Sequence, residues 1–306
     1  MSRKLRVAAI CTIYYPMSHA DAIVTKFLKG MSTDEGFFAP EVEVVSMYVD
    51  HVLESDIGVG LAQEHGVPIH PSIRRALHAG ADELNVDAVL LVGEHGDYGQ
   101  NEKGQRLYPR YELFKQIVAV FRLSGRSVPV FNDKHLSWKW DWAREMAQTS
   151  RKMGFAFLAG SSLPVTWRMP SIDLPYGADT EEVMCVAMGG VDSYDFHALE
   201  AIQCMAERRQ GGETGVTAVQ GLQGDAVWQA MAAGDWSKGG WDASLFEACL
   251  SRSQTLVQPE SYSHRYPTQE QIQEWVKEPV AYRIEYVDGT RATMLLMNGL
   301  VGDFTF

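Results

Sequence analysis

Apolar residues follow two alternating patterns along the first half of the chain. Stretches rich in apolar residues predict strands at residues 6–13, 42–48, 86–92, 128–131 and 155–158. The run at 86–92 is nearly continuous, as is typical of a strand buried on both faces of a parallel sheet. Apolar positions at helical spacing predict helices between them, at residues 20–29, 57–65, 72–78, 111–124 and 138–153. Ser137 is expected to cap the last of these helices. The alternation predicts a Rossmann-like, doubly wound α/β domain over residues 1–162.

The pattern changes after about residue 163. Longer alternating stretches predict strands with one solvated face, at residues 182–188, 216–222, 281–287 and 292–297. Asp288-Gly289 predicts a hairpin, and a helix is predicted at residues 197–209. Residues 224–275 are predicted to form helix and loop whose bounds are hard to assign. Residues 163–306 should therefore form an α+β domain with a mostly antiparallel sheet. The chain stops directly after a strand-like run, which favours a short or truncated domain, and the open sheet offers a surface for a homo-oligomer.

Charge and cysteine usage narrow the class of protein. The 306 residues carry a net charge of −12 without a block of basic residues, which argues against nucleic acid as a partner. No apolar stretch approaches the length of a membrane span. The four cysteines are scattered without a C-x-x-C spacing, as expected for reduced thiols in a cytoplasmic protein. Neither observation identifies a substrate, and we expect the partner to be a small molecule.

The turn after the first predicted strand contains no glycine. A dinucleotide-binding turn of the form G-x-G-x-x-G uses glycines so that the backbone can approach a pyrophosphate. Here residues 11–19 read Cys-Thr-Ile-Tyr-Tyr-Pro-Met-Ser-His, so bulky side chains fill that space. Asp50, at the end of the second predicted strand, stands where an acid for a cofactor ribose would be. The usual mode of NAD(P) binding is therefore in question, although an atypical one stays open.

Polar residues follow three of the predicted strands. Ligands of doubly wound sheets bind beyond the carboxyl ends of the strands, so these residues should share one rim. Their imidazoles and carboxylates are typical ligands of Zn²⁺ or Mn²⁺. The candidate metal ligands are His19, Glu94, His95, Asp97, Asp133 and Glu213. No H-E-x-x-H spacing occurs, and solvated loop residues or helix caps are the alternative interpretation.

Several strings resemble the glucose–fructose oxidoreductase/inositol dehydrogenase (Gfo/Idh/MocA) family. Val86-Asp87-Ala88-Val89 is similar to the family's fourth strand, and Asp133-Lys134-His135 stands where the family has Glu-Lys-Pro. Gly189-Gly190 followed by His197 resembles its glycine-then-histidine segment. The resemblance implies that Lys134 and His197 lie beside the reactive carbon of a sugar or polyol.

This chain departs from the family pattern beside both residues. His135 replaces the proline after the lysine, and Ser193 stands where the family commonly has an aspartate four residues before the histidine. Asp192 and Asp195 are the nearest substitutes for that aspartate. Glu200, one helical turn after His197, could orient it.

Aromatic and basic residues are the candidates for substrate binding. Aromatic faces suit sugar rings, although aromatic residues also fill cores. An arginine near the end of a helix can bind a carboxylate or phosphate, although it also complements the helix dipole. The candidates are Tyr15, Tyr98, Trp138, Trp167 and Arg208.

The acid–base residues are present while the pyrophosphate turn is filled. We therefore expect a non-redox hydrolase or lyase that uses acid–base or metal-assisted chemistry on a polar, carbohydrate-like substrate. Lys134 and His197 would handle protons, with His135 and Asp195 assisting. The alternatives are an NAD(P)-dependent sugar or polyol dehydrogenase with an atypical turn, and a ligand-binding protein without catalysis.

Overall fold

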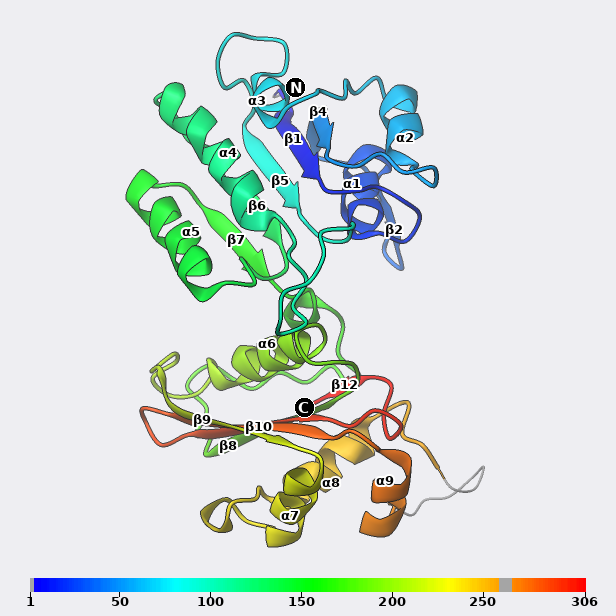
Figure 1. Ribbon diagram of the computed structural model, residues 1–306, viewed down its shortest axis with the longest axis vertical. Coiled ribbons are helices and arrows are strands. Elements are labelled where there is room, and N and C mark those ends of the chain that lie inside the picture. The colour runs from blue at the N-terminus through cyan, green and yellow to red at the C-terminus, as the bar shows by residue number, and fades with distance from the viewer. Residues whose placement is uncertain (1–2, 259–265) are drawn as a thin grey trace. The chain divides into compact units, whose positions relative to one another are not determined.

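A computed structural model describes residues 3–258 and 266–306. The chain divides into two compact units, residues 1–160 and residues 161–306 (Figure 1). Each unit has a sheet of its own and hydrophobic clusters of its own. No helix among the described residues is long and apolar enough to cross a membrane. None of the four cysteines forms a disulfide.

The first unit is built on a five-stranded parallel sheet. Its strands lie in the order β4-β1-β5-β6-β7, and their bounds are Val42–Val49, Leu5–Cys11, Ala88–Val92, Val130–Asp133 and Phe157–Gly160. A parallel bridge between Met47 and Ile69 adds a remnant of a further strand beside β4. With this remnant, the strands follow the 3-2-1-4-5-6 order of dinucleotide-binding domains.

Helices cover both faces of this sheet. They are α1 (His19–Lys29), α2 (Gly58–Glu64), α3 (Ile73–His78), α4 (Arg110–Leu123) and α5 (Trp140–Met153). Alternate residues of β1 enter different cores: Val7 packs with α1 and α2, and Ala8 packs with α3, α4 and α5. This two-sided burial is why the strands read as continuous apolar runs. A short hairpin of β2 (Met31–Thr33) and β3 (Gly36–Phe38), which the pattern did not predict, follows α1.

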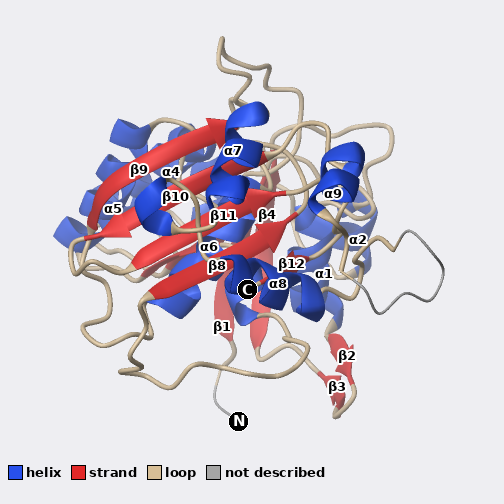
Figure 2. Cartoon of the chain, turned by 90° about the horizontal axis from the view of Figure 1, so that it is seen from below, coloured by secondary structure: helices blue, strands red, loops and turns tan. Residues whose placement is uncertain are grey.

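The second unit has a mixed, mostly antiparallel sheet, as predicted. Its order is β12-β8-β11-β10-β9, with bounds Phe304–Thr305, Glu182–Ala187, Arg291–Leu296, Val280–Tyr286 and Val216–Gln223. Only the β8–β11 pair among these is parallel. Helix α6 (Asp195–Ala206) packs on one face, and α7 (Asp225–Ala233), α8 (Ala243–Arg252) and α9 (Gln269–Trp275) pack on the other (Figure 2). Short 3-10 turns lie at Leu163–Val165 and Trp236–Lys238.

Two local predictions need correction. Helix α5 begins at Trp140 without a side-chain cap, because the Ser137 hydroxyl instead accepts a hydrogen bond from the Lys139 N–H in the preceding turn, at 3.2 Å. Helix α6 begins at Asp195, two residues before the predicted start.

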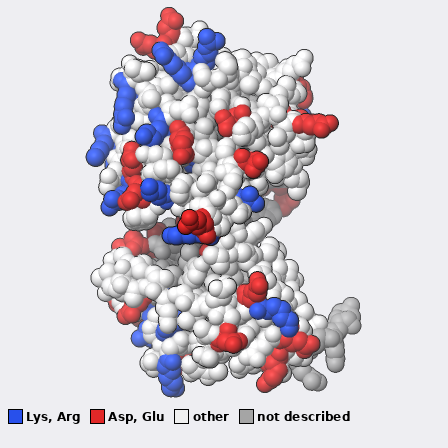
Figure 3. Space-filling view, in the orientation of Figure 1, with Lys and Arg blue, Asp and Glu red and all other residues white. Residues whose placement is uncertain are grey.

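Cations and carboxylates are interspersed on the face of each unit drawn in Figure 3.

Candidate functional site

The candidate site lies where the strand order of the first sheet reverses. Chain connections leave β1 and β5 towards opposite sides, and ligands of such sheets bind at this switch point. The segments after the two strands are tied together there. The Thr12 N–H donates to the Val92 carbonyl (3.1 Å), and the Thr12 hydroxyl donates to the Glu94 carbonyl (2.6 Å). These bonds fix the position of Glu94 beside the start of α1.

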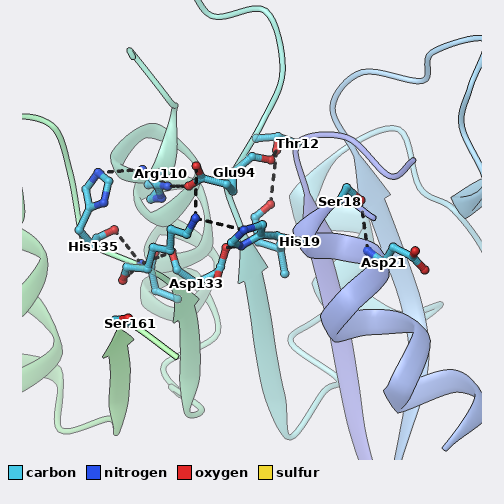
Figure 4. Close-up of polar contacts among 12 residues, drawn as sticks. Thr12, Ser18, His19, Asp21, Glu94, Arg110, Asp133, His135 and Ser161 are labelled. Carbon is cyan, nitrogen blue, oxygen red and sulfur yellow. Dashed lines mark hydrogen bonds and ion pairs between the residues drawn. The ribbon is translucent and has the colours of Figure 1, made fainter. Parts of the chain in front are cut away.

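An aspartate, a histidine and a lysine form a hydrogen-bonded chain at this point. His19 is the first residue of α1, and its Nδ1 lies 2.6 Å from Oδ2 of Asp133 at the end of β6 (Figure 4). His19 Nε2 lies 3.1 Å from Nζ of Lys134. A carboxylate on Nδ1 favours a proton there, so that Nε2 can accept from the ammonium group. The chain therefore offers a path for a proton between Lys134 and His19.

Lys134 is held in a partly desolvated position. Burial lowers the pKa of its amine from the ordinary value; the charge of Asp133 opposes this shift and that of Arg110 adds to it. Its Nζ lies 3.7 Å from a carboxylate oxygen of Glu94, but the other Glu94 oxygen pairs with the fully buried guanidinium of Arg110. Because Arg110 shares this carboxylate, Glu94 stabilises the ammonium form less than a lone acid would.

The backbone of Lys134 is also unusual. Its φ is +62°, a left-handed conformation that costs a non-glycine residue about 1–2 kcal/mol. Hydrogen bonds fix it there: the Lys134 carbonyl accepts from the Gly160 N–H (2.9 Å), and the Asn132 side-chain amide donates to the carbonyls of Lys134 and His135. Strain of this kind is retained where the surrounding structure over-determines it, typically at functional sites.

His95 closes the cluster on the side of β5. Its ring meets those of His19 and Tyr15 edge to face, with centroids 5.1 and 5.7 Å apart. Burial lowers the pKa of His95 to about 4, and the nearby His19 and Lys134 contribute to the shift. The imidazole is therefore neutral at neutral pH and adds no charge beside Lys134.

His135 does not point at the same chain of residues. Its Nε2 lies 3.1 Å from a guanidinium nitrogen of Arg110. Because a guanidinium only donates, this contact makes Nε2 an acceptor and places the ring proton on Nδ1. The structure therefore connects His135 to the Arg110–Glu94 pair, behind Lys134.

The expected metal centre is not supported. Among residues 3–258 and 266–306, no group of three or more His, Cys, Asp or Glu side chains is placed to hold a metal ion. Other groups of the chain bond to these carboxylates: Arg110 pairs with Glu94, and Asp133 bonds to His19. Asp97 is exposed. Glu213 belongs to the second unit, where it accepts from Gln203 and from the Gly215 N–H.

Asp50 is compatible with a role as the acid for a cofactor ribose. It follows β4, and its two carboxylate oxygens accept from the hydroxyls of Tyr48 (2.5 Å) and Tyr98 (2.8 Å). Burial, reinforced by Asp50, raises the pKa of both phenols, so they act as donors. The Tyr98 ring stacks on His51 with centroids 5.1 Å apart. Each carboxylate oxygen retains a second acceptor site, and ribose hydroxyls could donate to it.

The turn between β1 and α1 departs from a glycine-lined pyrophosphate site. Tyr14 is buried, and its hydroxyl is 2.8 Å from Thr25 Oγ1. Ser18 caps α1 through the Asp21 N–H (3.2 Å), and the Asp21 carboxylate accepts from the Met17 N–H (2.9 Å). The residues therefore fit a nicotinamide dinucleotide at the ribose acid and at the acid–base cluster. At the pyrophosphate, only the capped N-terminus of α1 remains to face the charge.

In the second unit, His197 lies in the first turn of α6. Its Nδ1 is 2.6 Å from the Ser161 hydroxyl. Asp195, a predicted catalytic residue, is the first residue of the helix. Its carboxylate accepts from the N–H groups of Ser193 and Phe196 and from the Tyr282 hydroxyl.

Three more of the predicted substrate-binding residues can be located in the structure. The Trp138 ring packs edge to face on Trp142, 4.9 Å away between centroids. Arg208 forms an ion pair with Asp173 (3.1 Å) and lies over the ring of Tyr176. Trp167 is exposed on the rim of a pocket of about 360 Å³ in the second unit.

The sequence interpretation gave no role to Arg110 or Ser161. Arg110 begins α4, where a positive charge opposes the helix dipole. This local conflict is the signal that could have shown Arg110 to serve another group, here Glu94. No motif in the sequence marks Ser161, and only the fold brings it to His197.

Comparisons with known proteins identify the fold. No model of a protein family matches the sequence, and a search of curated proteins finds no significant match. Among solved structures, UDP-N-acetylglucosamine 3-dehydrogenase GnnA from Acidithiobacillus ferrooxidans is similar, with a TM-score of 0.51 and 10% identity over 99% of this chain and 72% of that one. GenD2 from gentamicin A biosynthesis, in complex with NAD, has a TM-score of 0.50 and 15% identity over 99% and 68%. Apo scyllo-inositol dehydrogenase from Lactobacillus casei has a TM-score of 0.50 and 10% identity over 97% and 70%.

These structures confirm the resemblance to Gfo/Idh/MocA-type oxidoreductases at the level of the fold. They also contradict the expectation of a hydrolase or lyase. Two of the three are named as dehydrogenases, and the third holds NAD. The error came from giving the missing glycines of the first turn more weight than the order of the elements.

Proposed function

We propose that this chain is an NAD(P)-dependent oxidoreductase that acts on a hydroxyl or carbonyl group of a polar, carbohydrate-like substrate. The observation that carries the proposal is the chain Asp133–His19–Lys134 at the switch point of the sheet. It places a desolvated amine and a proton path where ligands of this fold bind. The dehydrogenases that share the fold support the redox assignment.

Residues of the first unit would hold the cofactor. Asp50 would accept hydrogen bonds from a ribose, and the N-terminus of α1 would face the pyrophosphate. The nicotinamide, when bound, supplies the acceptor or donor of the hydride that leaves or enters the substrate carbon.

The chain's own part in the reaction is the movement of a proton. In the oxidation direction, neutral Lys134 accepts the proton of the substrate hydroxyl at Nζ as the C–H bond gives up its hydride and the carbonyl forms. Its lowered pKa makes the neutral amine accessible. His19 Nε2 can then take a proton from Nζ, and Asp133 stabilises the resulting imidazolium. Reduction of a carbonyl reverses these transfers.

The test is a spectrophotometric assay of reduced nicotinamide with a panel of sugars, sugar nucleotides and inositols. Replacing Lys134 with alanine should lower kcat/KM by about 10²–10⁴-fold, the usual contribution of a positioned acid–base group. Lys152→Ala, at an exposed position near the end of α5, is the matched control and should leave the rate unchanged. No turnover of any substrate with either cofactor, or equal rates for wild type and Lys134→Ala, would overturn the proposal.

A further inference from the structure

A buried serine faces the histidine of the second unit. Ser161 follows β7, and its Oγ lies 2.6 Å from Nδ1 of His197. The same Oγ accepts a hydrogen bond from the Leu163 N–H at 3.1 Å. Ser161 is 9% exposed, so its hydroxyl needs partners within the protein.

The number of hydrogens available determines which atom donates in the Ser161–His197 hydrogen bond. The hydroxyl has one hydrogen to donate, and the Leu163 N–H already occupies an acceptor site on Oγ. Within the described part of the chain, the structure places no acceptor other than His197 Nδ1 at hydrogen-bond distance from this hydroxyl. Donation to Nδ1 leaves the ring proton on Nε2. The opposite direction would leave a buried hydroxyl hydrogen without an acceptor, at a cost of about 1–3 kcal/mol.

Aromatic rings surround the imidazole of His197. The rings of Tyr194, Phe196 and Phe304 have centroids 5.5 to 6.3 Å from its own. These contacts hold the plane of the imidazole in place beside Ser161. The carboxylate one turn further on, Glu200, accepts instead from the Ser161 N–H at 3.3 Å.

Asp195 and Ser193, which precede this histidine, bond to other groups. Asp195 accepts from two N–H groups and from the Tyr282 hydroxyl. Ser193, in the position expected for an aspartate, donates its hydroxyl hydrogen to the Gly190 carbonyl at 3.0 Å. A hydroxyl that donates to Nδ1 fixes the tautomer of the ring through a single hydrogen bond.

We propose that Ser161 fixes His197 as its neutral Nε2–H tautomer, so that the ring presents a hydrogen-bond donor to an oxygen of the substrate. Ser161 is then a positioning residue, acting through His197. The role of the donor at the substrate rests on the proposed oxidoreductase function, whereas the tautomer itself is a property of the free protein.

The test is long-range ¹H–¹⁵N NMR of the full chain with labelled histidine, in the absence of cofactor and substrate. The His197 signals are assigned by their loss in His197→Gln. Wild type at neutral pH should show a protonated Nε2 and an unprotonated Nδ1. Ser161→Ala should give a mixture of tautomers, Ser161→Thr should restore the single tautomer, and the control Ser162→Ala, at an exposed neighbour, should match wild type.

Two results would overturn this proposal. One is a wild-type His197 that is protonated on Nδ1 at neutral pH, which needs no variant to observe. The other is a Ser161→Ala protein that melts cooperatively and keeps a single Nε2–H tautomer. Because the spectra require no turnover, failure of the oxidoreductase assay would leave the tautomer assignment standing. Where the assay shows turnover, Ser161→Ala should lower kcat/KM by about tenfold or more, with recovery in Ser161→Thr.

Discussion

At the scale of single residues, the candidate site depends on how neighbouring groups share protons. Lys134 has a lowered pKa because it is buried, and His19 links it to Asp133. Glu94 lies near the Lys134 amine but is paired with Arg110. The cluster therefore combines a desolvated amine with an acceptor and a fixed counter-charge.

The sequence located most of this cluster but not its organisation. His19, Glu94, Asp133 and Lys134 could be found because each follows a predicted strand, and strand ends of a parallel sheet meet at one edge. What they do together could not be found, because it depends on which atoms face one another. The sequence favoured a metal at these carboxylates, whereas in the structure Arg110 pairs with Glu94.

His95 gives a prediction about pH and stability. Its pKa falls from the ordinary 6.5 to about 4 in the folded protein, so between these values the unfolded chain binds a proton that the folded chain does not. Stability should therefore be lost as the pH falls from 6.5 towards 4, by up to about 1.4 kcal/mol for each pH unit in this window.

The measurement is the free energy of unfolding in urea at several pH values, for wild type and His95→Asn. Asparagine keeps a polar, uncharged side chain and tolerates the positive φ of 67° at this position. The variant should lose less stability than wild type between pH 6.5 and 4. An identical pH dependence in the two proteins would contradict the assignment.

At the scale of elements, the turn between β1 and α1 separates this chain from a glycine-lined dinucleotide site. Tyr14 fills the turn and is buried against α2. The backbone there cannot approach a pyrophosphate as closely as glycines allow. The capped N-terminus of α1 and Asp50 are the features of the usual site that persist.

The packing of Tyr14 can be tested with two glycines of one helix. A Cβ added to Gly58 would come within 2.7 Å of the Tyr14 ring, whereas nothing lies within 4 Å of a Cβ at Gly60. Gly58→Ala should therefore destabilise the protein by about 1–3 kcal/mol through overpacking. Gly60→Ala should be neutral or stabilising by up to about 1 kcal/mol, since alanine favours a helix. Equal effects of the two changes in chemical denaturation would show that Tyr14 does not fill this turn.

Elements with a strong apolar pattern were predicted with their bounds, and those with a weak one were not. The parallel strands of the first unit are rich in apolar residues because helices cover both faces of the sheet. Helices α7, α8 and α9 lie in residues predicted only as helix and loop, since short helices with few buried positions carry little signal. The β2–β3 hairpin was missed because its residues are largely exposed.

At the scale of the whole molecule, each unit contributes distinct chemistry. The first carries the switch point, Asp50 and the Lys134 cluster. The second carries His197 and Ser161, on a sheet with helices on both faces. Strand β9 is an edge of that sheet and is exposed along most of its length, and association of two copies through the sheet stays a prediction.

The most direct test of the proposed function is whether the full chain binds a nicotinamide dinucleotide despite its filled turn. Isothermal titration calorimetry with NAD⁺, NADH, NADP⁺ and NADPH measures this for wild type, Asp50→Ala and, as a control, Asp34→Ala, which alters an exposed acid. We expect saturable binding of at least one dinucleotide. The affinity should be about 10–100-fold weaker in Asp50→Ala alone, as expected for loss of a hydrogen bond to a charged group. Absence of binding for all four dinucleotides, with the protein folded, would contradict the proposed function.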